Sequence, residues 1–356
     1  MRILASPAFS NERVNPYNAL LYRKIEASGH GVFEYSHKRV LKEKFDIVHV
    51  HWPDGYIDQR NWLKAIQRAF LLILMMRVAK LKGARLVWTA HNLKPHDAFH
   101  PKFSQIFLSH FLKLCNGLIF LTDEGKSSFL QHYPDQQDIP CAVIPHGHYR
   151  DSYPSPVEKE IAKKELGLIT DKKILLFMGM IKPYKNCDTL IKEFSEAKLK
   201  DYILVIAGKP ETPKYKEQLE LLAKDQDNIH MRLEFIPDDQ VHLYMSAADT
   251  VILPYKSILN SGALLLALSF NKPVIAPHIG AFIELQNELG QQWVYSYNDE
   301  FNSTNLGPML QQLDQLPRPP TCPLDNYDWR NLAELTVNFY EEILPSESPS
   351  QHKVSL

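Results

Sequence analysis

Residues 175–186 read LLFMGMIKPYKN, and this stretch determines the fold prediction. An apolar run ends at Gly179, and two lysines, Lys182 and Lys185, follow directly. The pattern predicts a buried strand, a tight turn, and cations close to the start of the next helix. A helix start attracts phosphate through its unpaired N–H groups and its dipole, and added lysines suit a diphosphate.

The composition excludes several classes of protein. The chain has 356 residues, which fits two domains of ordinary size, and 45% of them are hydrophobic, enough for a full core. Its 40 basic and 41 acidic side chains leave no net positive field, so we expect no nucleic-acid partner. The four cysteines form no CxxC pair, which is typical of reduced thiols in a cytosolic protein rather than of a disulfide framework or a zinc site.

Neither a signal peptide nor a membrane span is predicted. The first residues, MRILASPAF, predict a strand, because a signal peptide requires a longer apolar region. The run that comes closest to a span is AFLLILMM at residues 69–76, which is less than half of the ~20 residues required.

Short β-rich runs alternate with helical patterns along the chain. Several runs are apolar on both faces, as in parallel sheets, and the segments between them are mostly long enough for crossover helices. The runs are RILASP, GVFEYS, DIVHVHW, ARLVWTAHN, GLIFLTDEG, CAVIPHG, KILLFMG, YILVIAG, IHMRLEF, DTVILPY and KPVIAP. The sequence therefore predicts two doubly wound α/β domains.

The domain boundary is predicted within GHYRDSYPSPVEKE at residues 147–160, where proline, serine and charge replace the apolar periodicity. We expect an N-terminal domain at residues 1–152 and a C-terminal domain at residues 153–327. A helix at residues 328–344 is expected to pack back toward the N-terminal domain, followed by a disordered tail at residues 345–356.

Three glycine turns follow predicted strands of the C-terminal half. They are Gly179, Gly208 and the pair Ser261–Gly262, which opens an apolar helical stretch. Ligands bind beyond the carboxyl ends of the strands in open α/β sheets, so three such turns in one domain predict a phosphate-binding site. The simpler alternatives are lysines in a solvated loop and, for Gly262, a close contact between helix and sheet.

These motifs stand in an order that resembles the GT-B glycosyltransferases. More narrowly, residues 1 to about 340 are similar to the xanthan-type GDP-mannose:glycolipid 4-β-D-mannosyltransferases. The matching segments are NPY (15–17), HVHWPD (49–54), HNLKPHD (91–97), HGHYRD (146–151), IKPYK (181–185), GKPETP (208–213), LPYKSILNSGALLLALSFNKPVIAP (253–277) and the region from Trp293. The resemblance implies two Rossmann-like domains facing an interdomain cleft, with a sugar-nucleotide donor in the C-terminal domain and a lipid-linked sugar acceptor in the N-terminal domain.

The resemblance implies a donor site at the C-terminal turns. Its predicted residues are Gly179, Lys182, Lys185, Gly208, Pro254, Tyr255, Asn260, Ser261 and Gly262. Many retaining GT-B enzymes carry a pair of glutamates where this chain has Ile258 and Leu266, and often an arginine where it has Met180. These departures agree with an inverting enzyme in which Lys182 supplies the second positive charge.

Histidines follow several predicted strands of the N-terminal half. The predicted acceptor-binding residues are Asn15, Tyr17, His51, Trp52, Asn92, His96, His146, His148 and Tyr149. Any one of the histidines can instead be a core or capping residue, and His49 in particular is expected within the sheet. Metal binding and serine hydrolysis are disfavoured, because the chain has neither an HExxH motif nor a G-x-S-x-G elbow.

An inverting transfer is a direct displacement, in which the acceptor hydroxyl attacks the anomeric carbon as the diphosphate leaves. It needs a general base beside the acceptor and positive charge beside the leaving group. Asp97 and Asp54 are the candidate bases, with His91 orienting or contacting the sugar. The sequence does not rank the two aspartates, and either one can instead cap a helix.

The segment Asp225–Gln226–Asp227 matches the DxD motif with which another class of glycosyltransferase binds a metal–nucleotide complex. It stands within KEQLELLAKDQDNIH, a polar pattern that predicts a solvated helix end. We therefore expect no metal, and no cofactor beyond the nucleotide-sugar substrate.

The segment at residues 62–85 mixes apolar side chains with six basic ones. An ordinary crossover helix with a solvated basic face explains this pattern, and so does contact with an anionic membrane surface. A polyprenyl-diphosphate acceptor requires such contact. We therefore expect a cytoplasmic protein that associates peripherally with the inner face of the cytoplasmic membrane.

The leading prediction is an inverting mannosyltransferase that uses GDP-mannose and a lipid-linked oligosaccharide in exopolysaccharide biosynthesis. One alternative keeps the fold and uses a UDP-sugar donor, because nothing in the sequence distinguishes guanine from uracil. Two alternatives of another class are a sugar-nucleotide 2-epimerase and a non-catalytic sugar-nucleotide binder. The basic and apolar segment near residue 70 favours a transferase over an epimerase.

Overall fold

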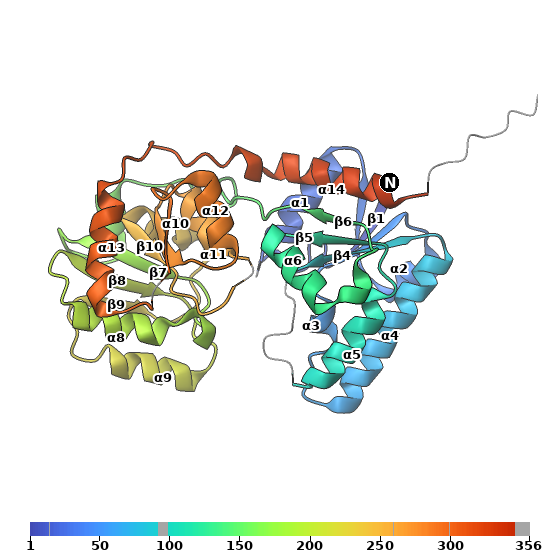
Figure 1. Ribbon diagram of the computed structural model, residues 1–356, viewed down its shortest axis with the longest axis horizontal. Coiled ribbons are helices and arrows are strands. Elements are labelled where there is room, and N and C mark those ends of the chain that lie inside the picture. Colours follow the sequence, from blue (N-terminus) through green and yellow to red (C-terminus); the bar gives the residue numbers. More distant parts are fainter. Residues whose placement is uncertain (14, 92–98, 259, 299, 346–356) are drawn as a thin grey trace, which may run out of the picture. The chain divides into compact units, whose positions relative to one another are not determined.

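The computed structural model describes residues 1–13, 15–91, 99–258, 260–298 and 300–345. The chain forms two compact units (Figure 1): unit 1 comprises residues 1–145 and 327–356, and unit 2 comprises residues 146–326. The boundary predicted from the sequence lies at residue 152, so residues 146–152 fall in unit 2 rather than in the N-terminal unit. Residues 346–356 of the predicted tail lie outside the described residues.

Unit 1 contains a six-stranded parallel sheet with the strand order β2-β1-β3-β4-β5-β6. The strands are β1 (Arg2–Ser6), β2 (Gly31–Glu34), β3 (Ile47–Val50), β4 (Arg85–Ala90), β5 (Gly117–Phe120) and β6 (Cys141–Val143). In the sheet, Ile3 pairs with Ile47, and Val48 pairs with Leu86. The strand order reverses between β1 and β3, which is where open α/β sheets bind ligands beyond the carboxyl ends of their strands.

Helices cover both faces of this sheet. One face packs against α2 (His37–Lys42), α3 (Pro53–Ile57), α4 (Trp62–Leu81), α5 (Pro101–Leu112) and α6 (Asp123–His132), with the short 3₁₀ helix η1 (Pro134–Gln136) after them. The other face packs against α1 (Tyr17–Ala27) and the C-terminal helix α14 (Trp329–Ile343). Trp329, Leu332 and Tyr340 of α14 share one apolar core with Tyr22 and Ile25 of α1, so α14 completes unit 1.

Unit 2 contains a second six-stranded parallel sheet, with the order β12-β11-β10-β7-β8-β9. The strands are β7 (Lys173–Met178), β8 (Tyr202–Ala207), β9 (Ile229–Arg232), β10 (Thr250–Ile252), β11 (Val274–Pro277) and β12 (Val294–Tyr297). This is the strand order of dinucleotide-binding folds, and it reverses between β7 and β10. The stretch 175–186 therefore follows a strand at the reversal point.

Three helices of unit 2, α9, α11 and α13, begin at residues whose side chains cap them. Ser261 caps α11 by accepting a hydrogen bond from the backbone N–H of Leu264 at 3.1 Å, and Asn302 forms a capping box with Asn305. The helices are α7 (Lys159–Glu165), α8 (Cys187–Ala197), α9 (Pro213–Leu222), α10 (Asp238–Ala247), α11 (Gly262–Ser269), α12 (Ala281–Leu289) and α13 (Ser303–Gln315). The 3₁₀ helices η2 (Pro183–Lys185) and η3 (Asp325–Tyr327) complete the elements.

The predicted fold class is confirmed, and each predicted β-rich run contains a strand of the structure. The strand β12 was not predicted from the sequence. Its residues VYSY form an edge strand in which only Val294 is fully buried, so the continuous apolar signal of the central strands is absent.

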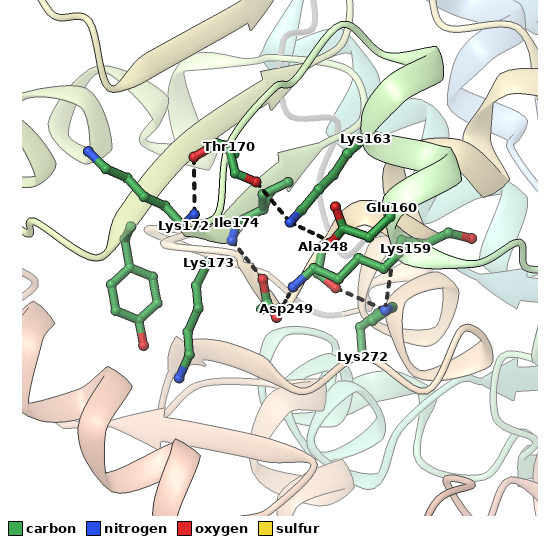
Figure 2. Close-up of polar contacts among 12 residues, drawn as sticks. Lys159, Glu160, Lys163, Thr170, Lys172, Lys173, Ile174, Ala248, Asp249 and Lys272 are labelled. Atoms are coloured by element: carbon green, nitrogen blue, oxygen red, sulfur yellow. Dashed lines mark hydrogen bonds and ion pairs between the residues drawn. The ribbon is translucent and has the colours of Figure 1, made fainter.

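A cluster of lysines lies at the amino ends of β7 and β10 (Figure 2). Asp249 accepts hydrogen bonds from the backbone N–H of Ile174 at 2.7 Å and from Lys159 Nζ at 2.5 Å. Lys272 Nζ donates to the carbonyl oxygen of Ala248 at 2.9 Å. Because these cations are paired and lie at the ends of the strands away from the expected ligand site, they join the elements of unit 2.

Two glycines allow a close approach at the carboxyl ends of β7 and β8. Gly208 has a φ of +152°, and a Cβ at this position would lie 1.8 Å from the carbonyl oxygen of Gly179. Gly179 has a φ of +124°, and a Cβ there would lie 3.7 Å from Lys185 Nζ. Residue 208 must therefore be glycine, because any side chain there would clash with the backbone of Gly179. Residue 179 favours glycine because its φ is positive, and it lies close to the Lys185 ammonium.

The variant Gly208→Ala should destabilise unit 2 far more than Gly167→Ala. Both glycines have a positive φ (+152° and +69°), but nothing lies within 4 Å of a Cβ at Gly167. The left-handed backbone alone costs alanine about 1–2 kcal/mol, and the clash at residue 208 adds to that cost. Urea unfolding of the two variants measures the difference, and equal losses of stability would contradict the close approach.

Candidate functional site

The candidate site of unit 2 lies at the reversal of its strand order. Gly179 follows β7, while Pro254 and Tyr255 follow β10, its neighbour on the other side of the reversal point. Both Pro254 and Tyr255 are buried. The backbone N–H of Lys256 donates to the carbonyl oxygen of Tyr184 at 2.8 Å, which ties the two strand-end segments together.

Lys185 ends η2 and is held between these two segments. The next residue, Asn186, adopts a left-handed conformation with a φ of 61°, and α8 begins directly after it. The ammonium of Lys185 lies 5.3 Å from the centre of the Tyr255 ring, a cation–π distance. Burial of the side chain, and secondarily the positive charge of Lys182, lower the pKa of Lys185 to about 8.

The two lysines of the turn differ in their partners. Lys182 Nζ forms an ion pair with Glu211 at 3.1 Å. Among the described residues, no carboxylate lies within ion-pair distance of Lys185. A largely desolvated ammonium without a carboxylate partner is costly, and a bound anion would remove that cost.

The start of α11 lies close to a histidine–tyrosine pair. A Cβ added at Gly262 would lie 3.1 Å from the hydroxyl of Tyr149 and 3.7 Å from Nε2 of His146. These two side chains contact each other at 3.2 Å, and the backbone N–H of Tyr149 donates to Ser269 Oγ at 2.8 Å. Glycine at residue 262 therefore leaves space between the helix start and this pair.

His146, His148 and Tyr149 were assigned to the acceptor domain by the sequence analysis, but they belong to unit 2. The reason is local packing, since this segment lies against α11 beyond the end of β6. Burial lowers the pKa of His146 to about 4, so its imidazole is neutral near pH 7. A direct acceptor contact by these three residues stays a prediction.

The remaining donor predictions lie in the same region of unit 2. Ser261 is 6% exposed and caps α11, while Asn260 precedes it in a partly buried position. The hydroxyl of Tyr255 is buried and has no hydrogen-bond partner among the described residues. Burial raises the pKa of Tyr255, so this hydroxyl keeps its proton and can donate it to a ligand.

In unit 1, the strand ends of β3 and β4 bring three histidines together. His51 Nδ1 lies 3.1 Å from His91 Nε2, and His51 Nε2 lies 2.6 Å from the hydroxyl of Tyr22. The same hydroxyl lies 2.9 Å from His49 Nδ1. His49 also contacts the Tyr340 hydroxyl at 2.6 Å, as well as Thr89 Oγ1 at 2.8 Å through Nε2.

Burial keeps the two inner histidines neutral. It lowers the pKa of His49 to about 3 and that of His51 well below its usual value. His51 is only 1% exposed, so it contacts His91 instead of presenting an open edge to a ligand. Its role in acceptor binding stays a prediction, because His51 is buried and has the more exposed His91 beside it.

His91 is held between aromatic rings. It stacks on Trp52 with ring centres 4.3 Å apart and an angle of 21° between the planes. Tyr17 meets His91 edge-on at 5.1 Å and also meets Trp329 of α14 at 5.2 Å. These contacts fix the plane of the His91 imidazole.

The other residues predicted for unit 1 occupy varied positions. Asn15 Oδ1 accepts a hydrogen bond from the backbone N–H of Tyr17 at 3.1 Å, so Asn15 supports the start of α1. Asp54 lies in the first turn of the short helix α3. The predictions for Asn92, His96 and Asp97 lie outside the described residues.

Three groups that contact the histidines were not predicted from the sequence: Tyr22, Thr89 and Tyr340. Each lies in an element predicted on other grounds, and its side chain reaches the site only through packing of α1, β4 and α14. Tyr340 is 291 residues from its partner His49, so no local pattern could have identified the contact.

Asp225 and Asp227 follow α9 in a turn, where Asp225 adopts a φ of 64°. This agrees with a helix end. In the part of the chain that the structure describes, no group of three or more His, Cys, Asp or Glu side chains is arranged to hold a metal ion.

Known proteins resemble this chain in both sequence and fold. Residues 158–302 match the family described as Glycosyl transferases group 1, a stretch that lies within unit 2 and includes Lys182 and Lys185. The chain is 29% identical over 342 residues to a GDP-mannose:glycolipid 4-beta-D-mannosyltransferase from Xanthomonas campestris pv. campestris, with 96% of this chain and 92% of that protein covered.

Solved structures share the fold at lower identity. Sucrose-phosphate synthase from Thermosynechococcus elongatus has a TM-score of 0.63 and 15% identity, with 96% of this chain and 94% of that chain covered. HepE from Anabaena, in complex with UDP-glucose, has a TM-score of 0.65 and 14% identity, with 96% and 98% covered. Structural neighbours of this chain, sucrose-phosphate synthase among them, are GT-B glycosyltransferases, so the predicted GT-B fold is confirmed.

The geometry of Lys185 predicts that affinity for inorganic pyrophosphate falls as the pH rises above 8. The free site has a Lys185 pKa of about 8, and a bound anion favours the ammonium and raises this pKa. Binding above pH 8 therefore takes up a proton, and affinity falls by up to about tenfold per pH unit. Calorimetric titration between pH 7 and pH 10 measures this dependence.

The probe titrates too, so two variants serve as comparisons. Lys192→Ala removes an exposed lysine of α8 and should keep the wild-type pH profile. Lys185→Ala should bind pyrophosphate weakly, and its affinity should lose the part of the pH dependence that begins near pH 8. The same profile in wild type and Lys185→Ala would contradict an anion site at Lys185.

Proposed function

Since the chain is a glycosyltransferase of the GT-B fold that resembles the GDP-mannose:glycolipid 4-β-D-mannosyltransferases, we propose that it transfers mannose from GDP-mannose to a lipid-linked oligosaccharide. The observation that supports this most strongly is the desolvated ammonium of Lys185 at the strand reversal of unit 2, which has no carboxylate within ion-pair distance among the described residues. A nucleoside diphosphate supplies the anion that this position lacks.

In the proposed reaction, the bond from the anomeric carbon to the diphosphate oxygen breaks while a bond to the acceptor oxygen forms. Negative charge develops on the departing diphosphate, and the ammonium groups of Lys185 and Lys182 stabilise it. The two ammonium groups supply the positive charge that a divalent cation supplies in other glycosyltransferases, so the proposed reaction needs no metal or cofactor. In this proposal the buried hydroxyl of Tyr255, which has no hydrogen-bond partner among the described residues, donates to the same ligand.

Inversion is the stereochemistry that we propose. The diphosphate of GDP-mannose is α-linked, and a direct displacement yields the β-mannoside that the name of the Xanthomonas relative specifies. This chain has Ile258 and Leu266 where many retaining enzymes carry glutamates. A Cβ at Gly280 would lie 2.3 Å from the carbonyl oxygen of Ile258, so the backbone at Ile258 packs closely against the start of α12.

The acceptor hydroxyl loses its proton to a carboxylate in this proposal. Asp54 and Asp97 remain the two candidates, and Asp54 lies in the first turn of α3, two residues after Trp52. Trp52 and His91 present stacked rings at that strand end, an arrangement suited to holding a sugar by its apolar face and its hydroxyl groups.

We further propose that unit 1 contacts an anionic membrane surface, where the acceptor is a polyprenyl-diphosphate oligosaccharide of exopolysaccharide biosynthesis. Of the fifteen exposed large hydrophobic side chains among the described residues, eight fall within residues 62–106. Leu63 is 75% exposed and Phe70 is 68% exposed, both on α4. Basic residues of the same helix, such as Lys64 and Arg68, are exposed beside them.

The apolar surface continues into a groove between α4 and α5. Its volume is about 320 Å³, and it is lined mainly by apolar side chains, among them Ile66, Leu74 and Ile106. Arg77 and His110 are the basic groups in the lining. An apolar groove with basic groups suits the boundary between the acyl chains and the anionic headgroups of a bilayer. No described helix has both the length and the hydrophobicity needed to cross a membrane.

A transfer assay tests the proposed function. With lipid extract that contains polyprenyl-diphosphate oligosaccharide, label from GDP-[14C]mannose should move into the organic phase, while label from UDP-glucose or UDP-glucuronate should not. Lys185→Ala should lower kcat/KM by about 10–100-fold, because a charge-assisted hydrogen bond contributes about 1.5–3 kcal/mol. Lys192→Ala, which removes an exposed lysine, should match wild type.

The competing functions give different results in the same assay. Transfer from a UDP-sugar alone would overturn the donor assignment. Conversion of the sugar nucleotide without any lipid would identify an epimerase, and binding without turnover would identify a non-catalytic protein.

Membrane contact predicts that Leu63→Glu weakens binding to phosphatidylglycerol vesicles by more than tenfold. The change removes a leucine that the bilayer would bury, a contribution of about 1.5–3 kcal/mol, and adds a charge that anionic lipids repel. The matched control is Leu221→Glu on α9, where the leucine is 72% exposed, against 75% for Leu63. Vesicle co-sedimentation measures both variants, and equal binding by the two would contradict the proposed surface.

A further inference from the structure

The loop between β1 and α1 points three successive backbone N–H groups at one carboxylate. The N–H groups of Ala8, Phe9 and Ser10 donate to Glu34 Oε2 at 3.1, 2.8 and 3.0 Å. The hydroxyl of Ser10 donates to the other oxygen, Oε1, at 3.1 Å. Successive N–H groups that converge in this way form a nest, a concave stretch of backbone that binds anions. The nest of residues 8–10 therefore already holds an anion that the protein itself supplies.

Glu34 reaches the nest from the neighbouring strand. It is the last residue of β2 and pairs with Ala5 of β1 in the sheet. Among the residues that the structure describes, no basic side chain forms an ion pair with Glu34. Its negative charge is therefore stabilised by backbone N–H groups and one hydroxyl, which is the kind of donor set with which a nest holds a phosphate group.

Contacts that do not involve Glu34 hold the nest in shape. The buried side chain of Asn18, on α1, donates from Nδ2 to the carbonyl oxygen of Pro7 at 2.7 Å. The backbone N–H of Glu12 donates to the carbonyl oxygen of Phe9 at 3.1 Å, which closes a turn across the nest. We therefore expect the three N–H groups to stay converged when the carboxylate of Glu34 is removed.

The nest lies where a doubly wound sheet can bind phosphate. The strand order of unit 1 reverses between β1 and β3, and the nest follows β1. The corresponding turn of unit 2 follows β7, its first strand, and contains Lys185, which has no ion-pair partner among the described carboxylates. The two turns therefore differ in charge. The turn of unit 2 offers a cation to a phosphate group, whereas the turn of unit 1 presents a carboxylate to it.

We propose that Glu34 is a specificity-determining residue whose carboxylate fills the nest, so that unit 1 rejects phosphate groups at its strand reversal and admits an uncharged sugar there. A phosphate group would have to displace Glu34 from four hydrogen bonds and then lie beside its charge. Sugar hydroxyl groups meet no such repulsion. For the identity of the sugar, a part of the acceptor, this inference rests on the proposed function.

Titration with inorganic phosphate tests the exclusion without any sugar or lipid. Every protein in this experiment carries Lys185→Ala, which removes the proposed anion site of unit 2, and sodium chloride keeps the ionic strength constant. The backbone amide signals of residues 8–10 in 1H–15N spectra report binding at the nest. With Glu34 in place these signals should show no saturable response. Glu34→Ala should bind phosphate at least about tenfold more tightly, because its vacated N–H groups can form charge-assisted hydrogen bonds.

Two further variants make the titration decisive even where Glu34→Ala does not fold. Glu34→Gln keeps the shape of the side chain and an oxygen that accepts from the nest, but it removes the charge, so phosphate should bind more tightly than with glutamate and less tightly than with alanine. Glu26→Ala removes an exposed glutamate of α1 and should bind phosphate as weakly as the Lys185→Ala parent. Equal phosphate affinity in Glu34→Gln and the parent, or saturable binding at residues 8–10 with Glu34 in place, would overturn the inference.

Transfer assays connect the nest to the substrate and separate this inference from the proposed function. In Glu34→Gln with Lys185 intact, inorganic phosphate should raise the KM for the lipid acceptor by about two- to tenfold more than in wild type, because phosphate in the nest competes with the sugar. An unchanged KM, although phosphate binds residues 8–10, would overturn the placement of a sugar there. Absence of mannosyl transfer in wild type would contradict the proposed function, and the titration would still decide whether Glu34 excludes phosphate.

Discussion

The desolvated ammonium of Lys185 is the constraint on which the proposed donor site depends. Its pKa is lowered because the side chain is buried and Lys182 is close, and no carboxylate among the described residues forms an ion pair with it. Particular backbone conformations around Lys185 hold its ammonium in this position. Gly179 and Gly208 let two strand ends approach closely, and Asn186 takes a left-handed conformation so that α8 can begin directly after the turn.

The two units share an architecture and differ in chemistry. Unit 2 offers positive charge at its strand reversal, which suits a leaving group that accumulates negative charge. Unit 1 offers imidazoles and aromatic rings at the ends of β3 and β4, which suit a sugar with its hydroxyl groups. A neutral histidine has both a donor and an acceptor, so it can pair with a hydroxyl group in either direction.

Much of the fold could be predicted from the sequence because parallel strands are buried on both faces and therefore appear as apolar runs. The runs at β7 and β8 are examples, with nearly every residue buried. β12 was missed since an edge strand is only half-buried. The glycines and lysines after β7 and β8 were identified because the position beyond a strand end has a general chemical meaning.

The parts of the site that were not predicted from the sequence depend on packing between residues far apart in the chain. The contact between Tyr340 and His49 joins the last helix to the third strand, and no spacing in the sequence signals it. The same limit explains the assignment of His146 and Tyr149. They follow the last strand of unit 1 along the chain, but their contacts with α11 place them in unit 2.

A crystal structure of the protein with bound GDP-mannose tests the central claim most directly. The account predicts that the diphosphate lies within hydrogen-bonding distance of Lys185 Nζ, beside the backbone of Gly179 at the end of β7. A diphosphate bound elsewhere on unit 2, or on unit 1, with Lys185 still free of any anion, would contradict it.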